Sequence, residues 1–486
     1  MSSSSAPAIL WFREDLRLTD NPALDAAVRT GRPLICVFIR ETGAEAPRPL
    51  GGASEWWLDK SLQALSTSLE AIGGKLVLRT GSAENQILAL VEETGAEAVF
   101  WNRRYGVPER DTDAAIKKAL KEQGLDCQSF NGRLLMEPWE LKTGSGGWYK
   151  VFTPFWRALQ ANYKPPEFLS APTRISAHPA ASESLTDWAL HPTKPDWSGG
   201  LAKAWQPGEA GAMARLDAFL DGPVSDYAST RNLPGVGTGT SRLSPHLRFG
   251  EIGPAQIWRA VKARLEAQQA DEDSARVFLS EIAWREFSYM LLYYNPALAT
   301  ENYNGNFNRM AWRDGEAEFA AWCRGETGYP IVDAGMRELW QTGWMHNRVR
   351  MIVASFLTKH LLLPWQRGEQ WFWDTLVDAD PAANPASWQW TAGSGADAAP
   401  YFRVFNPISQ GQKFDSNGEY VRQWCPELAR LPDKYLHAPF EADAQTLSRA
   451  GVKLGTTYPH AIIDHPVGRQ RALDAYSAMK EEQTAE

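Results

Sequence analysis

The sequence lacks several features that would immediately assign it to a class of proteins. Among 486 residues there are only four cysteines, and these stand far apart at positions 36, 127, 323 and 425. Their spacing provides neither a paired-cysteine metal motif nor a disulfide framework, so we expect no metal and a reducing, cytoplasmic compartment. No apolar run approaches the roughly 20 residues that span a bilayer. The N-terminal MSSSSAPA lacks the basic and apolar regions of a secretory signal, so we expect no membrane association.

An excess of positive charge is also lacking. The 50 Lys and Arg residues are outnumbered by 58 Asp and Glu residues, which gives a net charge of −8. This balance argues against a protein that coats nucleic acid without preference. A local basic patch stays open, because Arg337, Arg348 and Arg350 lie close together in the sequence and Arg285 and Arg403 stand in other aromatic-rich segments.

Tryptophan, in contrast, is abundant. The chain has 22 tryptophans, and half of them fall between Trp284 and Trp424. Cores are usually built from Leu, Ile and Val, because Trp is large and seldom fully buried. The clustering is compatible with an aromatic-rich core, with an aromatic binding wall, or with a path for electrons.

Short apolar runs alternate with helical patterns in the first third of the chain. The runs predict five strands, at residues 8–12, 33–39, 75–80, 98–101 and 126–130. Apolar residues at helical spacing predict helices between them, over 21–30, 54–69, 82–94 and 108–123. We expect Thr19 or Asp20 to cap the first helix and Ser54 to cap the second. Repeated βα units predict a doubly wound parallel five-stranded sheet.

The turn after the first predicted strand lacks the glycine-rich dinucleotide fingerprint, and the chain has no Walker A loop. Prolines accumulate between about 161 and 207, which is typical of a connector. The rest reads as helices joined by short turns, including 212–221, 254–268, 274–293, 329–342, 345–360 and 366–376. We therefore predict an α/β domain over 1–135, an interdomain connector over 136–210, and an all-α C-terminal domain over 211–486.

Four segments of the helical region are polar where a core should be apolar. They are GTGTSRLSPHLRFG (237–250), SEIAWREFSYML (280–291), GWMHNRVRM (343–351) and LVDADPAANPASWQW (376–390). The first can hold phosphate through backbone N–H groups or can be an ordinary helix cap. The others combine acids, amides, guanidinium groups and indoles, which suit a planar, hydrogen-bonding ligand but also occur in surface ion pairs.

These segments carry a family resemblance that extends over nearly the whole chain. AILWFREDLRLTDNPAL, TSRLSPHLRFGEI, GYPIVDAGMRELWQTGWMHNRVRMIVASFL, DAAPYFRVFNP and QWCPELAR follow one another in order, and together they resemble the cryptochrome/photolyase family. The resemblance implies an α/β antenna domain followed by an all-α domain that binds FAD. In the repair members, excited reduced flavin gives an electron to a pyrimidine dimer in UV-damaged DNA, and the electron returns after the dimer splits.

The resemblance also assigns residues. Contacts to FAD would come from Tyr227, Thr240, Ser241, Arg242, Leu243, Ser244, Arg350, Asp378, Asp380 and Asn384, with Arg350 paired to Asp378 and Asn384 facing flavin N5. Trp388, Trp365 and Trp312 would relay an electron from the surface to the flavin. Glu281, Trp284 and Asn347 would act with Asn384 as catalytic residues that line the dimer pocket, and Arg285 and Arg403 would join Glu281, Trp284 and Asn347 in binding DNA.

Among the relatives, the residues favour an enzyme that repairs cyclobutane pyrimidine dimers, a deoxyribodipyrimidine photo-lyase, acting as a monomer. The alternative is a blue-light photoreceptor of the cryptochrome branch, whose plant-type members usually have Asp at the position of Asn384. The (6-4) photolyases carry a His-His pair where this chain has His346-Asn347. Glu109 matches an antenna-binding position for 5,10-methenyltetrahydrofolate, while its neighbour Pro108 departs from that pattern, so a deazaflavin or an empty antenna site stays open.

Overall fold

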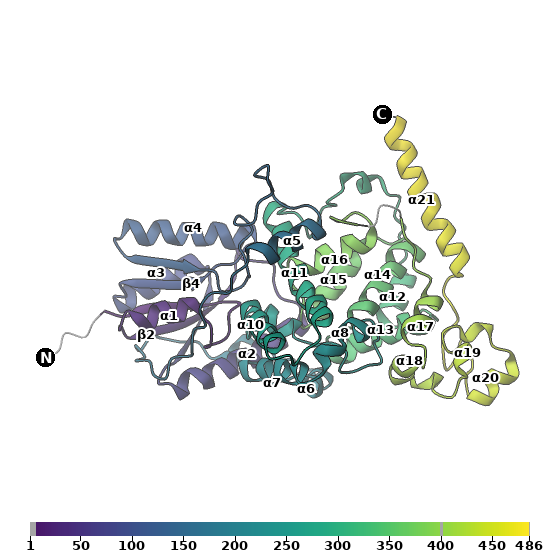
Figure 1. Cartoon of the computed structure of the whole chain (residues 1–486), viewed down its shortest axis with the longest axis horizontal. Coiled ribbons are helices and arrows are strands. Elements are labelled where there is room, and N and C mark those ends of the chain that lie inside the picture. Colours follow the sequence, from purple (N-terminus) through teal and green to yellow (C-terminus); the bar gives the residue numbers. More distant parts are fainter. Residues whose placement is uncertain (1–5, 399–401, 486) are drawn as a thin grey trace. The chain divides into compact units, whose positions relative to one another are not determined.

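The computed structural model describes residues 6–398 and 402–485, so residues 1–5 of MSSSSAPA and 399–401 of the motif DAAPYFRVFNP lie outside it. The described chain forms two compact units (Figure 1). The first combines Met1–Ser225 with Ser241–Pro296, and the second combines Asp226–Thr240 with Ala297–Glu486. The chain thus passes between the units at 225/226, 240/241 and 296/297. The division into 1–135, 136–210 and 211–486 stays a prediction about functional domains.

The first unit is built on the five-stranded parallel sheet that the sequence predicts. Its strands are β1 (Ala8–Phe12), β2 (Leu34–Glu41), β3 (Leu76–Gly81), β4 (Ala98–Asn102) and β5 (Asp126–Phe130), in the order β3-β2-β1-β4-β5. In the register, Ile9 lies opposite Ile35 on one side and Val99 on the other. Every residue of β1 is buried, whereas β5 is an edge strand with exposed positions. A fully buried central strand is expected where helices cover both faces.

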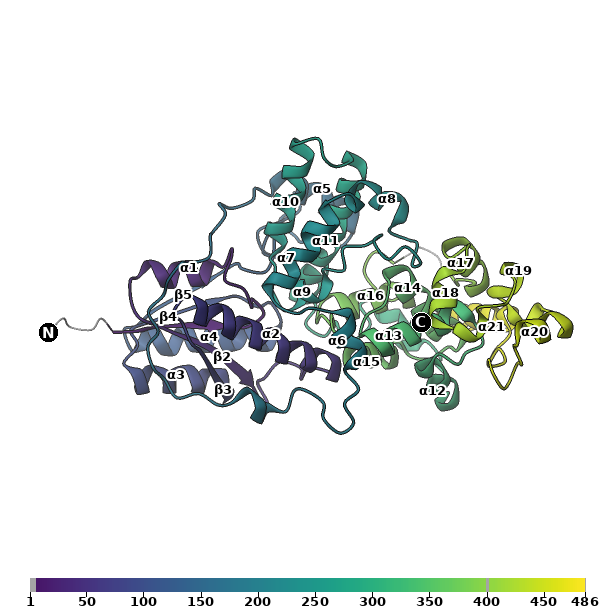
Figure 2. The same cartoon turned by 90° about the horizontal axis from the view of Figure 1, so that it is seen from below.

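Helices follow the strands as the βα pattern predicts. They are α1 (Pro22–Arg29), α2 (Gly52–Ala71), α3 (Ala83–Thr94) and α4 (Val107–Glu122). On one face of the sheet, Ile87, Leu90 and Ile116 of α3 and α4 form a core with the buried strand residues Ile9 and Val37. Figure 2 shows α1 and α2 away from α3, on the other side of the strands. The sheet is therefore doubly wound, which confirms the predicted α/β fold.

The predicted helix caps are wrong. The residue that caps α1 is Asn21, whose side chain accepts a hydrogen bond from the backbone N–H of Leu24 at 3.2 Å. Asp20 has a left-handed backbone (φ 55°) and its carboxylate pairs with Arg259 instead. Helix α2 begins at Gly52 after the N-cap Gly51, so Ser54 lies inside the helix and is buried. Local capping rules cannot predict an ion pair with a residue distant in the sequence, or a helix that begins after a glycine N-cap.

The remaining helices of the first unit are α5 (Phe152–Asn162), α6 (Gly199–Ala204), α7 (Glu209–Leu220), α9 (Ser244–Arg248), α10 (Pro254–Glu266) and α11 (Glu272–Tyr294). The stretch predicted as a connector holds α5 and α6 as well as loops. Helix α11 packs against α5 and α10. A predicted helix over 274–293 corresponds to α11, which is capped by the Asp271 side chain through the N–H of Ser274.

The second unit is all-helical in its described part, as predicted. Its helices are α8 (Tyr227–Thr230), α12 (Glu316–Arg324), α13 (Pro330–Thr342), α14 (Asn347–Ser355), α15 (Trp365–Thr375), α16 (Ala383–Ala392), α17 (Pro407–Phe414), α18 (Glu419–Trp424), α19 (Asp433–Leu436), α20 (Ala444–Ala450) and α21 (His465–Ala485). One turn of π-helix, Phe356–His360, continues α14. A core that includes Trp322, Trp365 and Trp388 lies among α12 to α16.

Within the described residues, no helix is long and apolar enough to cross a membrane. The same part of the chain contains no group of three or more His, Cys, Asp or Glu side chains that could hold a metal ion.

Candidate functional site

A partly buried ion pair in the second unit joins two of the residues predicted to contact the flavin. Arg350 on α14 donates from Nη2 to both carboxylate oxygens of Asp378, at 2.8 and 3.1 Å, and from Nε to the backbone carbonyl of Met345 at 2.7 Å. Asp378 is only 7% exposed. A buried carboxylate without a partner would be costly, so each charge holds the other in place. This confirms the predicted pairing, while its role toward the flavin stays a prediction.

Asp380 and Asn384 are both placed by the start of α16. Oδ1 of Asp380 accepts hydrogen bonds from the N–H groups of Ala382 and Ala383, at 2.9 and 2.8 Å, directly before and at the first residue of the helix. Asn384, one turn further on, donates from Nδ2 to the backbone carbonyl of Glu369 at 3.1 Å and to its Oε1 at 2.9 Å. In the described part of the chain no protein group donates to Oδ1 of Asn384, which leaves this acceptor for a ligand.

Sequence reasoning missed Glu369. Its side chain lies on α15 and is 2% exposed, and it fixes which end of the Asn384 amide points away from the protein. The available signal was a single acid in the aromatic segment RGEQWFW. Nothing local connects that acid to an amide 15 positions later, because the contact depends on how α15 packs against α16.

Trp388 lies in the core between α15 and α16 and is 2% exposed. Its ring meets Phe372 edge-on at 5.0 Å between centroids and Trp322 at 6.2 Å. Beneath the ring is Gly368, where an added Cβ would lie 2.1 Å from Cη2 of Trp388. The indole therefore occupies the space that a side chain at 368 would need.

We expect Gly368→Ala to destabilise the protein by about 1–3 kcal/mol, because the new methyl group forces the buried indole off its rotamer. Without this contact the change would stabilise a helix by roughly 0.5–1 kcal/mol. Chemical unfolding of both proteins gives the sign. Gly199→Ala is the matched control, since no atom lies within 4 Å of a Cβ at that helical glycine; stabilisation in both variants would contradict the packing argument.

The other two tryptophans of the predicted relay occupy different surroundings. Trp365 begins α15, is fully buried, and donates from Nε1 to Oδ1 of Asn302 at 2.8 Å. It shares the core of Trp388. Trp312 is half-buried and packs on a separate cluster that includes Phe307 and Phe402. Two buried indoles, Trp388 and Trp365, and the half-buried Trp312 are compatible with a route for electrons from the interior toward solvent. The relay stays a prediction.

The residues predicted to contact the FAD phosphates lie close in sequence to the positions where the chain changes from one unit to the other. Tyr227 is buried at the start of α8, with the guanidinium of Arg231 5.6 Å from its ring centre. Thr240 ends a segment of the second unit, whereas Ser241, Arg242, Leu243 and Ser244 return to the first. Arg242 has a left-handed backbone (φ 52°) and its guanidinium lies 4.9 Å from the centre of the Trp205 ring. Their phosphate contacts stay predictions.

The predicted pocket residues of the first unit lie on α11. Trp284 stacks on Phe152 of α5, with 3.7 Å between ring centres and an interplanar angle of 7°. Phe152 therefore covers one face of the indole, and the Phe287 ring also meets it, with 5.9 Å between centres and an angle of 79°. Glu281 lies one turn earlier on the same helix and is half-buried. Phe152 was not predicted, because its contact with Trp284 is long-range.

Arg285 points into the first unit. Its Nη1 donates to the backbone carbonyl of Arg133 and to Oε1 of Glu286, both at 2.9 Å. Burial raises the pKa of Glu286 to about 7, and the Arg285 guanidinium partly opposes this rise. One nitrogen of this guanidinium thus serves the fold, and the DNA-binding role of Arg285 stays a prediction.

A group of arginines gives the second unit a local positive charge. Arg348 donates from Nε and Nη2 to Oδ1 of Asn232, at 3.2 and 2.7 Å. Burial, together with the nearby charges of Arg231 and Arg403, lowers the pKa of the Arg348 guanidinium. Asn347 is exposed beside it at the first position of α14. Repulsion among these cations means that an anion would be attracted to this surface.

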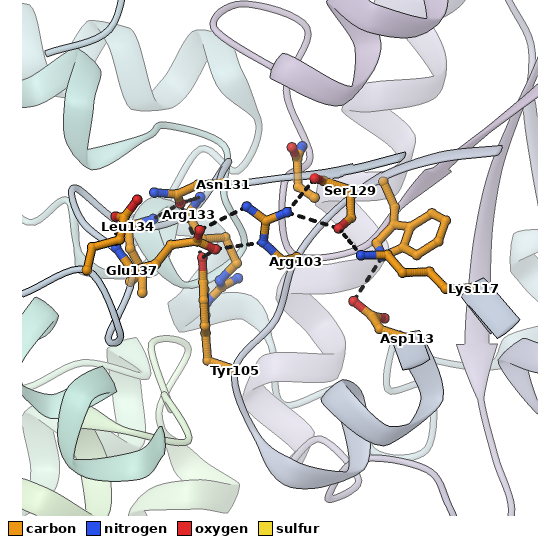
Figure 3. A network of polar contacts seen from close by, with 12 residues as sticks. Arg103, Tyr105, Asp113, Lys117, Ser129, Asn131, Arg133, Leu134 and Glu137 are labelled. Carbon is orange, nitrogen blue, oxygen red and sulfur yellow. Dashed lines mark hydrogen bonds and ion pairs between the residues drawn. The ribbon is translucent and has the colours of Figure 1, made fainter. Parts of the chain in front are cut away.

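Glu109, predicted to contact an antenna pigment, lies in the first turn of α4 and is 8% exposed. Burial raises the pKa of its carboxyl, against the opposing effect of Arg104. The loop before it is held by a polar network (Figure 3) in which Arg103 donates from Nε to Glu137 at 2.6 Å and from Nη1 to Oγ of Ser129 at 3.0 Å. Tyr105 donates to the same Glu137 at 2.9 Å. The network keeps this part of the loop in one conformation.

Two segments of the chain match family models of known proteins. Residues 8–174 match the DNA photolyase family, and residues 278–478 match the FAD binding domain of DNA photolyase. A deoxyribodipyrimidine photo-lyase of Agrobacterium fabrum is 55% identical over 482 residues, which cover 99% of each chain. Cryptochrome-1 of Arabidopsis thaliana is 38% identical over 98% of this chain and 71% of its own length.

Two solved structures show the same architecture. A bacterial class III photolyase from Agrobacterium tumefaciens superimposes with a TM-score of 0.96 at 54% identity, covering 99% of both chains. A cryptochrome from Synechocystis sp. superimposes with a TM-score of 0.87 at 30% identity, covering 98% of this chain and all of the other. With full-length identity this high and both domains matched in order, the chain belongs to the DNA photolyase family of enzymes and carries its FAD-binding domain.

Proposed function

We propose that this protein repairs cyclobutane pyrimidine dimers in DNA as a deoxyribodipyrimidine photo-lyase. The observations that carry the proposal are the Arg350–Asp378 ion pair and the Asn384 amide, whose Oδ1 accepts from no described protein group. An amide oxygen and a fixed ion pair fit the polar edge of a flavin ring, which presents N–H groups and carbonyls. Bound reduced FAD supplies, on excitation, the electron that opens the dimer and receives it again afterwards.

The protein's own groups have separate tasks in this scheme. Asn384 offers Oδ1 to the flavin because Glu369 holds its Nδ2. Arg350 and Asp378 together are neutral, so they orient polar flavin atoms without adding net charge. Trp284 offers the ring face that Phe152 leaves uncovered for stacking with a base rotated out of the helix. Glu281 and Asn347 supply hydrogen bonds to the carbonyls of the dimer.

The direct test is illumination of a dimer-containing oligonucleotide with the protein in its fully reduced form. We expect pyrimidine absorbance to return in blue or near-ultraviolet light and not in the dark. Trp284→Ala should weaken binding of the damaged strand by about ten-fold or more, because stacking of a base on an aromatic ring contributes roughly 1–3 kcal/mol. No repair by the reduced protein would overturn the proposal and turn attention to a photoreceptor role, given the cryptochrome relatives.

DNA binding should be local and sensitive to salt, despite the net charge of −8. Arg348 and Arg403 concentrate positive charge on one part of the second unit, and cations that neutralise phosphates release counterions. We expect log K for damaged duplex to fall linearly with log salt, and Arg403→Gln to reduce that slope by about one. A titration followed by fluorescence anisotropy measures both. Affinity that is independent of salt would contradict this assignment.

For the antenna we propose 5,10-methenyltetrahydrofolate with Glu109 as one contact. Glu109 is buried, and burial raises the pKa of its carboxyl; a carboxyl in this position can hydrogen-bond to a pterin. An absorption spectrum of the purified protein tests the pigment through its near-ultraviolet band, and Glu109→Leu should reduce that band relative to the flavin bands. An unchanged band in Glu109→Leu would remove Glu109 from the antenna site.

A further inference from the structure

A small cavity lies beside the π-helix turn of the second unit, and the described residues that line it include none of those assigned above to the flavin. Its volume is about 90 Å³, several times the roughly 10–15 Å³ that one water requires. The residues that line it include Ser355, Lys359, Thr391, Phe402, Arg403 and Tyr476. The cavity is therefore large enough for a group of a few heavy atoms and has polar groups on its wall.

The charge on this wall is of one sign. Lys359 is 1% exposed, and within the described residues its Nζ meets only the backbone carbonyl of Arg403 at 3.5 Å and the ring of Phe402, 3.5 Å from its centre. The Arg403 guanidinium lies 5.1 Å from the Phe405 ring centre, and no described carboxylate pairs with it. None of the described residues that line the cavity is acidic. A buried ammonium group without an acidic partner is unusual, because burial of an unpaired charge is costly.

The pKa of Lys359 also reflects the lack of an acidic partner. Burial lowers the pKa of its ammonium group to about 7, and no neighbouring carboxylate opposes the change. The other titratable groups at the cavity are Arg403 and Tyr476. His465 and Arg471 of α21 contact His360, the next residue of the π-helix, and not Lys359. An anion in the cavity would therefore be the first negative charge that Lys359 meets.

Hydrogen-bond donors are available as well. The Ser355 hydroxyl accepts a hydrogen bond from the N–H of Phe405 at 3.3 Å, and its own hydrogen is donated to no described protein group. Lys359 has three N–H donors and Arg403 has five in a planar fork that matches an oxyanion. π-Helical turns occur frequently at functional sites, and here the turn is what places Lys359 against the cavity.

We propose that this cavity is a binding site for a small oxyanion of the phosphate class, held by Lys359, Arg403 and Ser355. The same chemistry has two sources: a free ion, or a backbone phosphate of bound DNA. Only the second source rests on the function proposed above. No hydrogen bond joins Lys359 or Ser355 to Asn384 or to the Arg350–Asp378 pair, while Arg403 also belongs to the DNA-binding surface proposed above.

The test is isothermal titration of the full-length protein with inorganic phosphate and, separately, with sulfate. We expect saturable binding to the native protein, and a loss of about ten-fold or more in affinity in Lys359→Met and a smaller loss in Ser355→Ala. Lys434→Met is the matched control, because Lys434 also lies over an aromatic ring, 4.8 Å from the centre of Tyr435, but is exposed; it should bind like the native protein. Unfolding curves without phosphate check that each variant is folded.

Sulfate keeps its charge between pH 6 and pH 9, so its pH profile reports on the protein. We expect its affinity to fall as the pH rises through about 7, and this dependence should vanish in Lys359→Met. No saturable binding of either anion, or an equal loss in Lys359→Met and Lys434→Met, would overturn the proposal.

Undamaged duplex distinguishes the two sources. If duplex displaces bound phosphate and Lys359→Met weakens duplex binding, the site takes a backbone phosphate. If duplex leaves phosphate binding unchanged, the site takes the free ion. Repair of dimers by the Ser355→Ala protein is measured alongside, so that failure of the repair proposal is seen separately from failure of the anion site.

Discussion

Light-driven reduction of oxidised FAD should slow by more than about ten-fold in Trp365→Phe. Phenylalanine is much harder to oxidise than tryptophan, so an electron cannot pass from position 365 to an oxidised Trp388. The fold should survive, because Phe fills most of the buried space. The cost should be about 1–2 kcal/mol, from lost volume and from the hydrogen bond that Trp365 gives to Asn302. Absorbance at the flavin band during illumination follows the reduction.

Repair by the chemically reduced Trp365→Phe protein should match that of the native protein, since the repair electron moves directly between flavin and dimer. Trp340→Phe is the control, because Trp340 is 65% exposed and stacks on Trp371. It tests whether the loss of any tryptophan slows photoreduction. Unchanged photoreduction in Trp365→Phe would remove the relay assignment. Lost repair in the reduced variant would point to structural damage instead.

Asn384→Asp should make the stability of the protein strongly dependent on pH. In the native protein Nδ2 of Asn384 donates to Oε1 of Glu369 at 2.9 Å, and both side chains are at least nine-tenths buried. An aspartate at 384 would bring two carboxylates into contact, which raises the pKa of one of them in the folded state above its unfolded value of about 4. The folded variant then binds more protons than the unfolded chain.

Stability of Asn384→Asp should therefore fall as the pH rises from about 4 through the raised pKa, and the loss should persist above it. A rise of about two pKa units corresponds to roughly 3 kcal/mol. Chemical unfolding at pH 5 and pH 8 measures this loss against the native protein. The double variant Asn384→Asp with Glu369→Gln restores a donor–acceptor pair and should recover most of it. An equal loss at both pH values would mean that the two side chains are not in contact.

The sheet could be predicted from the sequence because its signal is local. The first four strands contain short apolar runs, whereas β5 (DCQSF) is mostly polar. Both β1 and β5 begin and end at the predicted positions. The helix caps were predicted less well. Asp20 has the right chemistry for a cap, but Arg259, far away in the chain, takes its carboxylate. Local propensity yields to a buried ion pair when the two compete.

The site could be predicted only where the family motifs carry it. Arg350 and Asp378 stand in such motifs, and their ion pair is present. Glu369 and Phe152 were missed, although each determines what a predicted residue can do: Glu369 sets the orientation of Asn384, and Phe152 covers one face of Trp284. Contacts of this kind depend on which side of a helix faces its neighbour. Composition and motif spacing do not specify that.

The three passages of the chain between the compact units have a consequence for synthesis. Residues 226–240 leave the ribosome before residues 241–296, yet they belong to the unit whose remaining residues begin at Ala297. All residues of the first unit are therefore synthesised before those of the second are complete. Residues 226–240 can pack into their own unit only after the C-terminal helices have been synthesised. For the same reason no single cut releases either unit intact: a fragment ending at Ser225 lacks α9 to α11, and one starting at Ala297 lacks Tyr227.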